Sequence, residues 1–168
     1  MRLTELHWVP GPWPGKLALA ARPRGGEWLE DEIAGWRSAG VDTVVSLLEQ
    51  DEERDLDLSD EGKAVRAHSM RFKPLPIGDR QVPLSEIDFS RKIDELDREL
   101  AAGRNVVVHC RQGIGRTGLM AGCLLVVRGV EPESAVRRVS EARGAAVPET
   151  AEQRRWIDHY AEMLTSAR

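Results

Sequence analysis

The residues with the clearest chemical potential lie between positions 106 and 118, where an apolar run ends at a cysteine. Three consecutive valines, Val106 to Val108, predict a short buried strand. The chain continues through Cys110 into a glycine-rich loop, and an apolar helix is predicted to begin near Arg116. A cysteine in this position faces unpaired backbone N–H groups and the positive end of a helix dipole. Such surroundings favour the thiolate, which is the nucleophilic form.

The loop after Cys110 is suited to binding an anion. Gly113 and Gly115 allow the backbone to curl so that its N–H groups point inward. Arg116 adds a planar fork of donors that matches the oxygens of a phosphoryl group. The pattern therefore predicts a phosphate-binding loop with a nucleophile at its base. A buried structural cysteine on a tight turn is the simpler alternative, but it explains neither the glycines nor the arginine.

The order His109-Cys110, five residues, then Arg116-Thr117-Gly118 resembles the signature of the cysteine-dependent protein tyrosine phosphatases, and more narrowly their small dual-specificity branch. The resemblance implies that Cys110 attacks phosphorus and forms a phosphocysteine intermediate. It also implies that Arg116 clamps the phosphoryl oxygens. The phosphate-binding residues would be Arg111, Gln112, Gly113, Ile114, Gly115 and Arg116.

The resemblance gives roles to three neighbouring side chains. His109 would orient the loop and help to tune the thiolate, with a plain packing histidine as the alternative. Thr117 would help the thiolate to leave when the intermediate hydrolyses, although it could simply be a helix-entry residue. We expect the Arg111 side chain to point to solvent, where it would still attract anionic substrates.

A leaving phenolate or alkoxide needs a proton, and the best candidate donor is Asp79. This residue lies in a loop bounded by proline and glycine, thirty-one positions before Cys110, where small dual-specificity phosphatases carry their general acid. Asp88, on the next predicted helix, is the weaker candidate, and a turn aspartate without a chemical role is the alternative for Asp79. Gln153 matches a late glutamine that the family can use to position the hydrolytic water, but a surface helix glutamine is an equal alternative.

The alternation of helices and strands predicts an α/β fold with a central mixed, mainly parallel sheet flanked by helices, as in phosphotyrosine protein phosphatases. We expect Lys16 to Ala20 to form a short edge strand. In the amphipathic helix from 85 to 102, Ile87 and Ile93 are expected to point inward with Leu96 and Leu100. The predicted helices cover 26–39, about 59–68, 85–102, 119–128, 132–143 and about 150–160, and the other strands cover 41–48, 70–75 and 106–108.

The segment from 49 to 61 is strongly acidic. A solvated loop leading into a helix is the favoured interpretation. The alternative is a rim that repels acidic phosphopeptides or recruits a basic partner.

The whole chain, 168 residues with a formal net charge of -4, predicts a single domain over 1–168. The charge argues against nucleic acid or a membrane surface as the main partner. No apolar run approaches the roughly eighteen residues of a membrane span, and the N-terminus lacks a secretory pattern. The two cysteines, Cys110 and Cys123, are separated by a predicted helix, so we expect no disulfide between them. A catalytic thiolate must stay reduced, and we therefore expect a reducing, cytoplasmic location.

These observations predict a phosphatase that acts on phosphotyrosine, and on phosphoserine or phosphothreonine, in a phosphorylated protein or a small phosphomonoester. A phosphatase for an inositol phosphate, a phospholipid or an RNA 5′-end is the second hypothesis, although the neutral Gln112 and Ile114 replace the paired lysines of lipid-directed relatives. A phosphoprotein-binding module that has lost catalysis is the third. We expect no metal and no cofactor.

Overall fold

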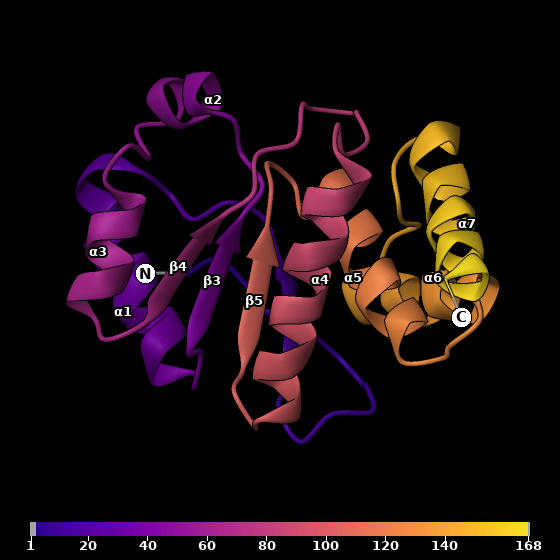
Figure 1. The fold of residues 1–168 in the computed structure, drawn as a ribbon. Coiled ribbons are helices and arrows are strands. Elements are labelled where there is room, and N and C mark those ends of the chain that lie inside the picture. The colour runs from indigo at the N-terminus through magenta and orange to yellow at the C-terminus, as the bar shows by residue number, and fades with distance from the viewer. Residues whose placement is uncertain (1–2, 168) are drawn as a thin grey trace.

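The computed structural model describes residues 3–167 and has a five-stranded sheet at its centre, in the order β1-β2-β5-β3-β4 (Figure 1). Only β1 runs antiparallel to its neighbour, and the other pairs are parallel. The predicted mixed, mainly parallel α/β fold is therefore confirmed. The strands are β1 (His7–Val9), β2 (Leu17–Ala20), β3 (Thr43–Ser46), β4 (Arg71–Pro74) and β5 (Val106–His109).

The central strand β5 is buried along its whole length, with β2 on one side and β3 on the other. Val107 is paired with Ala18 and with Val44, so both edges of β5 are covered by neighbouring strands, and all four residues of β5 are buried. A parallel strand in this position favours a continuous apolar sequence, which is the pattern of the three valines.

Helices cover both faces of the sheet (Figure 1). The core beside α1 and α3 contains Ile33, Trp36 and Val65, whereas the core on the other face joins α4, α5, α6 and α7 through residues such as Phe89 and Leu124. The helices are α1 (Leu29–Ser38), α2 (Gln50–Asp55), α3 (Glu61–Ala67), α4 (Glu86–Ala101), α5 (Gly115–Val127), α6 (Pro132–Arg143) and α7 (Ala151–Ser166), with a 3-10 turn at Gly26–Trp28.

Two expectations about these elements are wrong. The strand at Leu17–Ala20 is internal, because the three-residue β1 covers its outer side and takes the edge position. Ile87 is 70% exposed rather than buried. The inward stripe of α4 begins instead at Phe89, which is four residues before the buried Ile93 and therefore lies on the same helix face.

The carboxyl ends of β3, β4 and β5 meet at one edge of the sheet, near the short helix α2 (Figure 1). The acidic segment follows β3, the segment with Asp79 follows β4, and the cysteine loop follows β5. Open parallel sheets bind ligands at this edge. The topology therefore collects three segments that are distant in sequence around Cys110.

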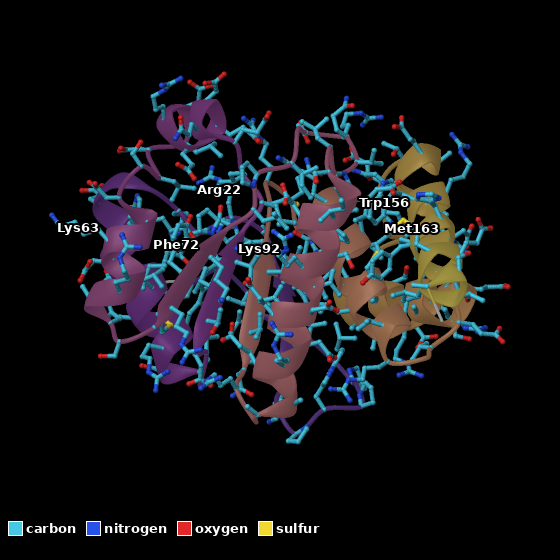
Figure 2. The ribbon with its side chains drawn as sticks, in the orientation of Figure 1. Arg22, Lys63, Phe72, Lys92, Trp156 and Met163 are labelled. Atoms are coloured by element: carbon cyan, nitrogen blue, oxygen red, sulfur yellow. The ribbon has the colours of Figure 1, made fainter. Side chains whose placement is uncertain are left out.

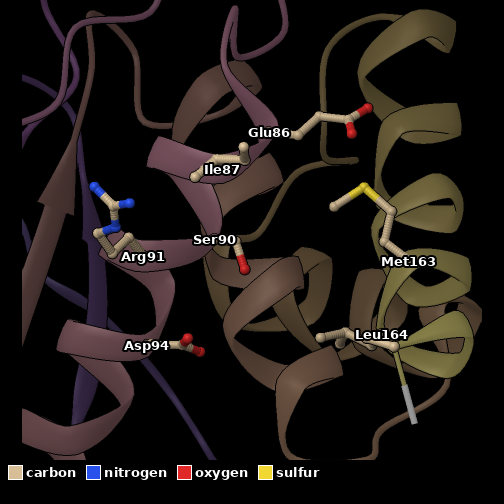
Figure 3. A pocket seen from close by; sticks show the side chains of 8 residues that line it. Glu86, Ile87, Ser90, Arg91, Asp94, Met163 and Leu164 are labelled. Atoms are coloured by element: carbon tan, nitrogen blue, oxygen red, sulfur yellow. The ribbon is translucent and has the colours of Figure 1, made fainter.

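A separate hollow of about 420 Å³ lies between α4 and α7 (Figure 3). Met163 projects from α7 toward α4 (Figure 3), and Figure 2 labels it together with Trp156 of the same helix. The Trp156 ring packs edge-on against that of Phe89, with ring centroids 4.7 Å apart. This hollow shares no lining residue with the one over Cys110. No helix within residues 3–167 is long and apolar enough to span a bilayer.

Candidate active site

Cys110 lies between the end of β5 and the loop that leads into α5, at a small hollow of about 50 Å³. The residue is only 3% exposed. β5 delivers it to the sheet edge, and α5 begins at Gly115, so the loop between them contains only four residues after the cysteine. The hollow is lined by Asp79, Cys110, Arg111, Gln112, Gly115, Arg116 and Glu149.

The loop holds four successive carbonyl groups away from the hollow. The carbonyl of Cys110 lies 3.3 Å from His109 Nδ1, and that of Arg111 accepts from the Arg22 backbone N–H at 3.2 Å. Arg143, at the end of α6, donates to the next two carbonyls, those of Gln112 at 2.9 Å and Gly113 at 3.1 Å. In a trans peptide the following N–H points opposite to the carbonyl. The N–H groups of residues 111 to 114 are therefore turned toward the anion-binding side.

Gly113 is required by this geometry. Its φ is 72°, in the left-handed region that disfavours other residues. A Cβ atom here would also clash with the backbone carbonyl of Ala20 on β2. The glycine predicted from sequence to curl the loop does so in the structure.

Arg116 is 1% exposed and forms a bidentate ion pair with the carboxylate of Glu52. Its Nη1 and Nη2 atoms donate to the two carboxylate oxygens of Glu52, at 2.6 and 2.9 Å. Nη1 also donates to the carbonyl of Ile77 at 2.8 Å. This bidentate pair fixes the plane of the guanidinium. The hydrogen bonds that Arg116 makes within residues 3–167 use Nη1 and Nη2, which leaves the Nε–H able to meet a phosphoryl oxygen.

The charges of this pair stabilise each other. Burial raises the pKa of Glu52, but hydrogen bonds from Arg116 and the Glu49 backbone outweigh burial and lower the pKa to about 2. Burial likewise lowers the pKa of Arg116, and the Glu52 carboxylate reverses the direction and raises it. Both groups are therefore ionised at neutral pH.

Asp79 lies over the same hollow as Cys110, with Oδ1 3.3 Å from Arg116 Nη2 and with a side chain 55% exposed. Asp88 is exposed in the first turn of α4, and it lines a different hollow with Pro76 and Leu84. The structure thus brings Asp79 to the cysteine and leaves Asp88 away from it.

Gln153 is fully buried, so the alternative of a surface glutamine is wrong. Its Oε1 accepts from the N–H groups of Glu149 and Thr150, and its Nε2 donates to the Gln81 carbonyl at 3.0 Å. The amide is thus occupied with capping α7 and joining two loops. Thr117 is also buried, and its hydroxyl has no hydrogen-bond partner within residues 3–167.

A comparison with models of known protein families classifies the chain that carries this loop. The family described as PTP-SAK, Swiss Army Knife protein, DSP-PTPase phosphatase domain, matches residues 5–159. The chain belongs to this phosphatase family. The predicted resemblance to the dual-specificity branch is confirmed.

The relatives of this phosphatase agree with that classification. Protein 197R of Invertebrate iridescent virus 6, named as a candidate tyrosine phosphatase, is 27% identical over 144 residues, which are 83% of this chain and 52% of the viral protein. The chain therefore spans about half the length of that relative. A second match is the phosphatidylinositol 3,4,5-trisphosphate 3-phosphatase and protein-tyrosine-phosphatase PTEN1 of Arabidopsis thaliana, 38% identical over 64 residues, or 35% of this chain and 15% of that protein.

Solved structures share the fold of this phosphatase at low identity. Kinase associated phosphatase, crystallised with its catalytic-site cysteine replaced by serine, superposes with a TM-score of 0.89 at 18% identity, covering 99% of this chain and 98% of that one. PTPMT1 in complex with PI(5)P superposes with a TM-score of 0.75 at 18% identity, covering 95% and 98%.

The phosphatase site also contains residues that the sequence did not single out. Glu52 belongs to the acidic segment but is only 8% exposed, because it turns inward to Arg116. It also accepts from Arg111 Nε at 3.1 Å, so Arg111 is tethered at the rim rather than pointing freely to solvent. Glu149, over the hollow, is paired with Arg80 at 2.6 Å. The sequence feature that could have indicated a role for Glu52 is its position soon after a predicted parallel strand, since such strands end at the same sheet edge as Cys110.

Proposed function

We propose that the protein hydrolyses phosphotyrosine, and also phosphoserine or phosphothreonine, monoesters through a phosphocysteine intermediate on Cys110. The observation that carries this proposal is the convergence of three groups on one hollow: the cysteine, the inward N–H groups of its loop, and the paired Arg116 and Asp79. Each group supplies what phosphoryl transfer needs, namely a nucleophile, charge stabilisation and a proton donor.

In the first step the Cys110 thiolate attacks phosphorus, so that an S–P bond forms while the P–O bond to the leaving group breaks. The loop N–H groups and the Nε–H and Nη2–H of Arg116 hold the phosphoryl oxygens. A phosphoryl group bound there competes with Asp79 for Nη2. Asp79, released from that contact, acts in its protonated form and transfers this proton to the leaving oxygen as the P–O bond breaks.

In the second step a water molecule attacks phosphorus and the S–P bond breaks. Asp79, now ionised, accepts the proton of the water, and Cys110 leaves as a thiolate. The Thr117 hydroxyl, buried in the first turn of α5 and without another partner among the described residues, supplies a hydrogen bond to the departing sulfur. Gln153 acts in this scheme by fixing the Glu149 backbone beside the hollow.

Monoesters with one phosphate fit the rim better than polyphosphorylated headgroups do. The carboxylate of Glu149 and that of Asp79 both line the hollow, and Gln112 is neutral. A second or third phosphate next to these groups would face like charge. A thiolate nucleophile also has to stay reduced, so we propose a reducing, cytoplasmic setting for the activity.

The test is a panel of phosphotyrosine, phosphothreonine and phosphoinositide substrates, with a small aryl phosphate as a reference. We expect the highest kcat/KM on phosphotyrosine peptide. The Cys110→Ser variant should lose turnover on every member, because a serine hydroxyl remains protonated at neutral pH. Preference for the phosphoinositide would contradict the substrate assignment, whereas residual Cys110→Ser turnover within about tenfold of wild type would contradict the covalent step.

A further inference from the structure

The histidine before Cys110 is in contact with a buried acidic residue, Glu61, at the start of α3. His109 is fully buried at the end of β5, and Glu61, the first residue of α3, is 1% exposed. His109 Nε2 lies 2.6 Å from Glu61 Oε2. The Trp36 ring of α1, with its centroid 5.9 Å from that of the imidazole, covers the pair.

The surroundings of His109 determine where its protons are. Nδ1 lies 3.3 Å from the carbonyl oxygen of Cys110, which can only accept a hydrogen bond. A carboxyl group at Nε2 can accept a proton from the ring or donate one to it. In either case Nδ1 has to carry a proton of its own, because two acceptors facing each other would repel.

Glu61 has no other polar task in this position. Its second carboxylate oxygen, Oε1, is buried without a hydrogen-bond partner among the described residues. A buried carboxylate with one unpaired oxygen costs folding free energy. Among the described residues, the hydrogen bond to His109 is the contact that offsets this free-energy cost. We therefore look for the role of Glu61 in that contact.

We propose that Glu61 is a positioning residue for the phosphate loop. By occupying Nε2, it holds His109 in the state whose Nδ1–H donates to the Cys110 carbonyl. That hydrogen bond turns the peptide group between Cys110 and Arg111, so that the Arg111 N–H faces the anion. The proposal rests on the proposed function for its catalytic consequence, but not for the geometry of the loop.

The first measurement concerns the unmodified protein. The ¹⁵N and ¹H NMR spectrum of the His109 ring should show a protonated Nδ1 in the resting state, coupled to a slowly exchanging proton. An unprotonated Nδ1 would overturn the proposal, whatever the activity of the protein.

The second measurement compares variants by their affinity for orthovanadate, which binds without turnover. In Glu61→Leu the His109 ring is no longer held at Nε2, so its Nδ1–H signal should change chemical shift and exchange with water faster. Affinity for vanadate and kcat/KM should both fall by roughly 10- to 100-fold, the range seen when outer-shell partners of metal-ligating histidines are removed. Glu61→Gln should keep both within roughly threefold, because the amide N–H can donate to Nε2 in place of the acid.

Glu99→Leu is the matched control, since Glu99 is also a buried glutamate, and it accepts from Thr43 on the far side of the sheet from Trp36. It should lower stability as Glu61→Leu does but leave vanadate affinity unchanged. Equal losses of vanadate affinity in Glu99→Leu and Glu61→Leu, or a native His109 spectrum in Glu61→Leu, would contradict the proposal. If wild type binds vanadate and shows the predicted ring but turns over no phosphomonoester, the proposed function fails and the role of Glu61 stands.

Discussion

At the residue scale, the contact between Asp79 and Arg116 links the proposed proton donor to the proposed phosphate clamp. The two side chains lie 3.3 Å apart, and the Asp79 side chain remains 55% exposed. The bidentate pair with the buried Glu52 holds the Arg116 guanidinium in place, so the exposed Asp79 is the partner that a ligand can displace. Binding of a phosphoryl group can therefore release the acid at the moment when a leaving group arrives.

If Asp79 is the general acid, the effect of removing it depends on the leaving group. Asp79→Asn should lose about 10² to 10⁴ in rate on a phosphotyrosine peptide, whose phenolate leaves poorly. An aryl phosphate with an acidic phenol should lose much less, because that leaving group needs little protonation. The measurement is kcat/KM on a series of aryl phosphates of graded phenol acidity, because kcat/KM reports the phosphorylation step and not the later hydrolysis of the phosphocysteine.

Asp88→Asn is the control for this series, because Asp88 is an exposed aspartate of the neighbouring helix that lines another hollow. It should leave all rates close to wild type. A uniform loss across the Asp79→Asn series, or a larger loss from Asp88→Asn, would show that the acid is a different residue.

At the element scale, the short helix α2 exists in its observed position because of Glu52. The helix has six residues, and Glu52 closes a capping box by accepting from the Glu49 backbone N–H at 3.1 Å. The same carboxylate joins α2 to the start of α5 through Arg116. One side chain thus anchors an otherwise exposed turn of helix to the phosphate loop.

This anchor predicts a pH dependence of stability. The pKa of Glu52 is about 2 in the fold, against an ordinary value of 4.5, so its contribution is complete above about pH 4.5 and is lost as the pH falls toward 2. Glu52→Gln should therefore reduce the free energy of unfolding by about 3 kcal/mol at neutral pH. The difference from wild type should shrink toward zero as the pH falls to 2 and below, because wild-type Glu52 then becomes protonated.

Urea unfolding at several pH values measures this difference. Asp51→Asn, on the same helix, is the control, since its ion pair with Arg54 is largely exposed and should contribute at most about 1 kcal/mol. A Glu52→Gln effect that is independent of pH would mean that the ion pair does not stabilise the fold.

At the scale of the whole molecule, the sequence was enough to predict the central sheet with helices on both faces and the loop that follows Cys110. The valine run predicted β5 because a strand buried on both faces needs continuous apolar residues. Gly113 and Arg116 predicted the loop, because a positive φ and planar donors are local properties. Gly115 does not curl the loop as expected: it begins α5, where a Cβ would crowd Gln153 and Glu149. Hydrophobic periodicity, with the glycines and prolines between the elements, predicted most of the strands and helices but not β1 or α2.

The remaining features depend on tertiary packing that no local pattern specifies. Eight acidic residues lie between 49 and 61, and nothing in their spacing marks Glu52 and Glu61 as the two that turn inward. β1 has only three residues, which are too few for a periodic signal in the sequence. Because β1 pairs with the outer side of Leu17–Ala20, that strand is internal and not at the edge. Ile87 could have been excluded from sequence, since it falls outside the stripe of Phe89, Ile93, Leu96 and Leu100.

Cys123 provides an internal comparison for the chemistry of Cys110. It lies within α5, fully buried, and burial raises its pKa well above the ordinary value for a thiol. A nucleophile is not expected at such a position. Any covalent chemistry on cysteine should therefore be confined to Cys110.

The most direct measurement of the covalent mechanism is a rapid-quench experiment on Asp79→Asn with an aryl phosphate of acidic phenol. This substrate should still phosphorylate the enzyme quickly, while hydrolysis slows because no carboxylate accepts the proton of the attacking water. We predict a burst of phenol close to one equivalent per enzyme, with the phosphoryl group found by mass spectrometry on the peptide that contains Cys110. Release of phosphate without a burst and with Cys110 unmodified, or a phosphoryl group on another residue, would contradict the mechanism.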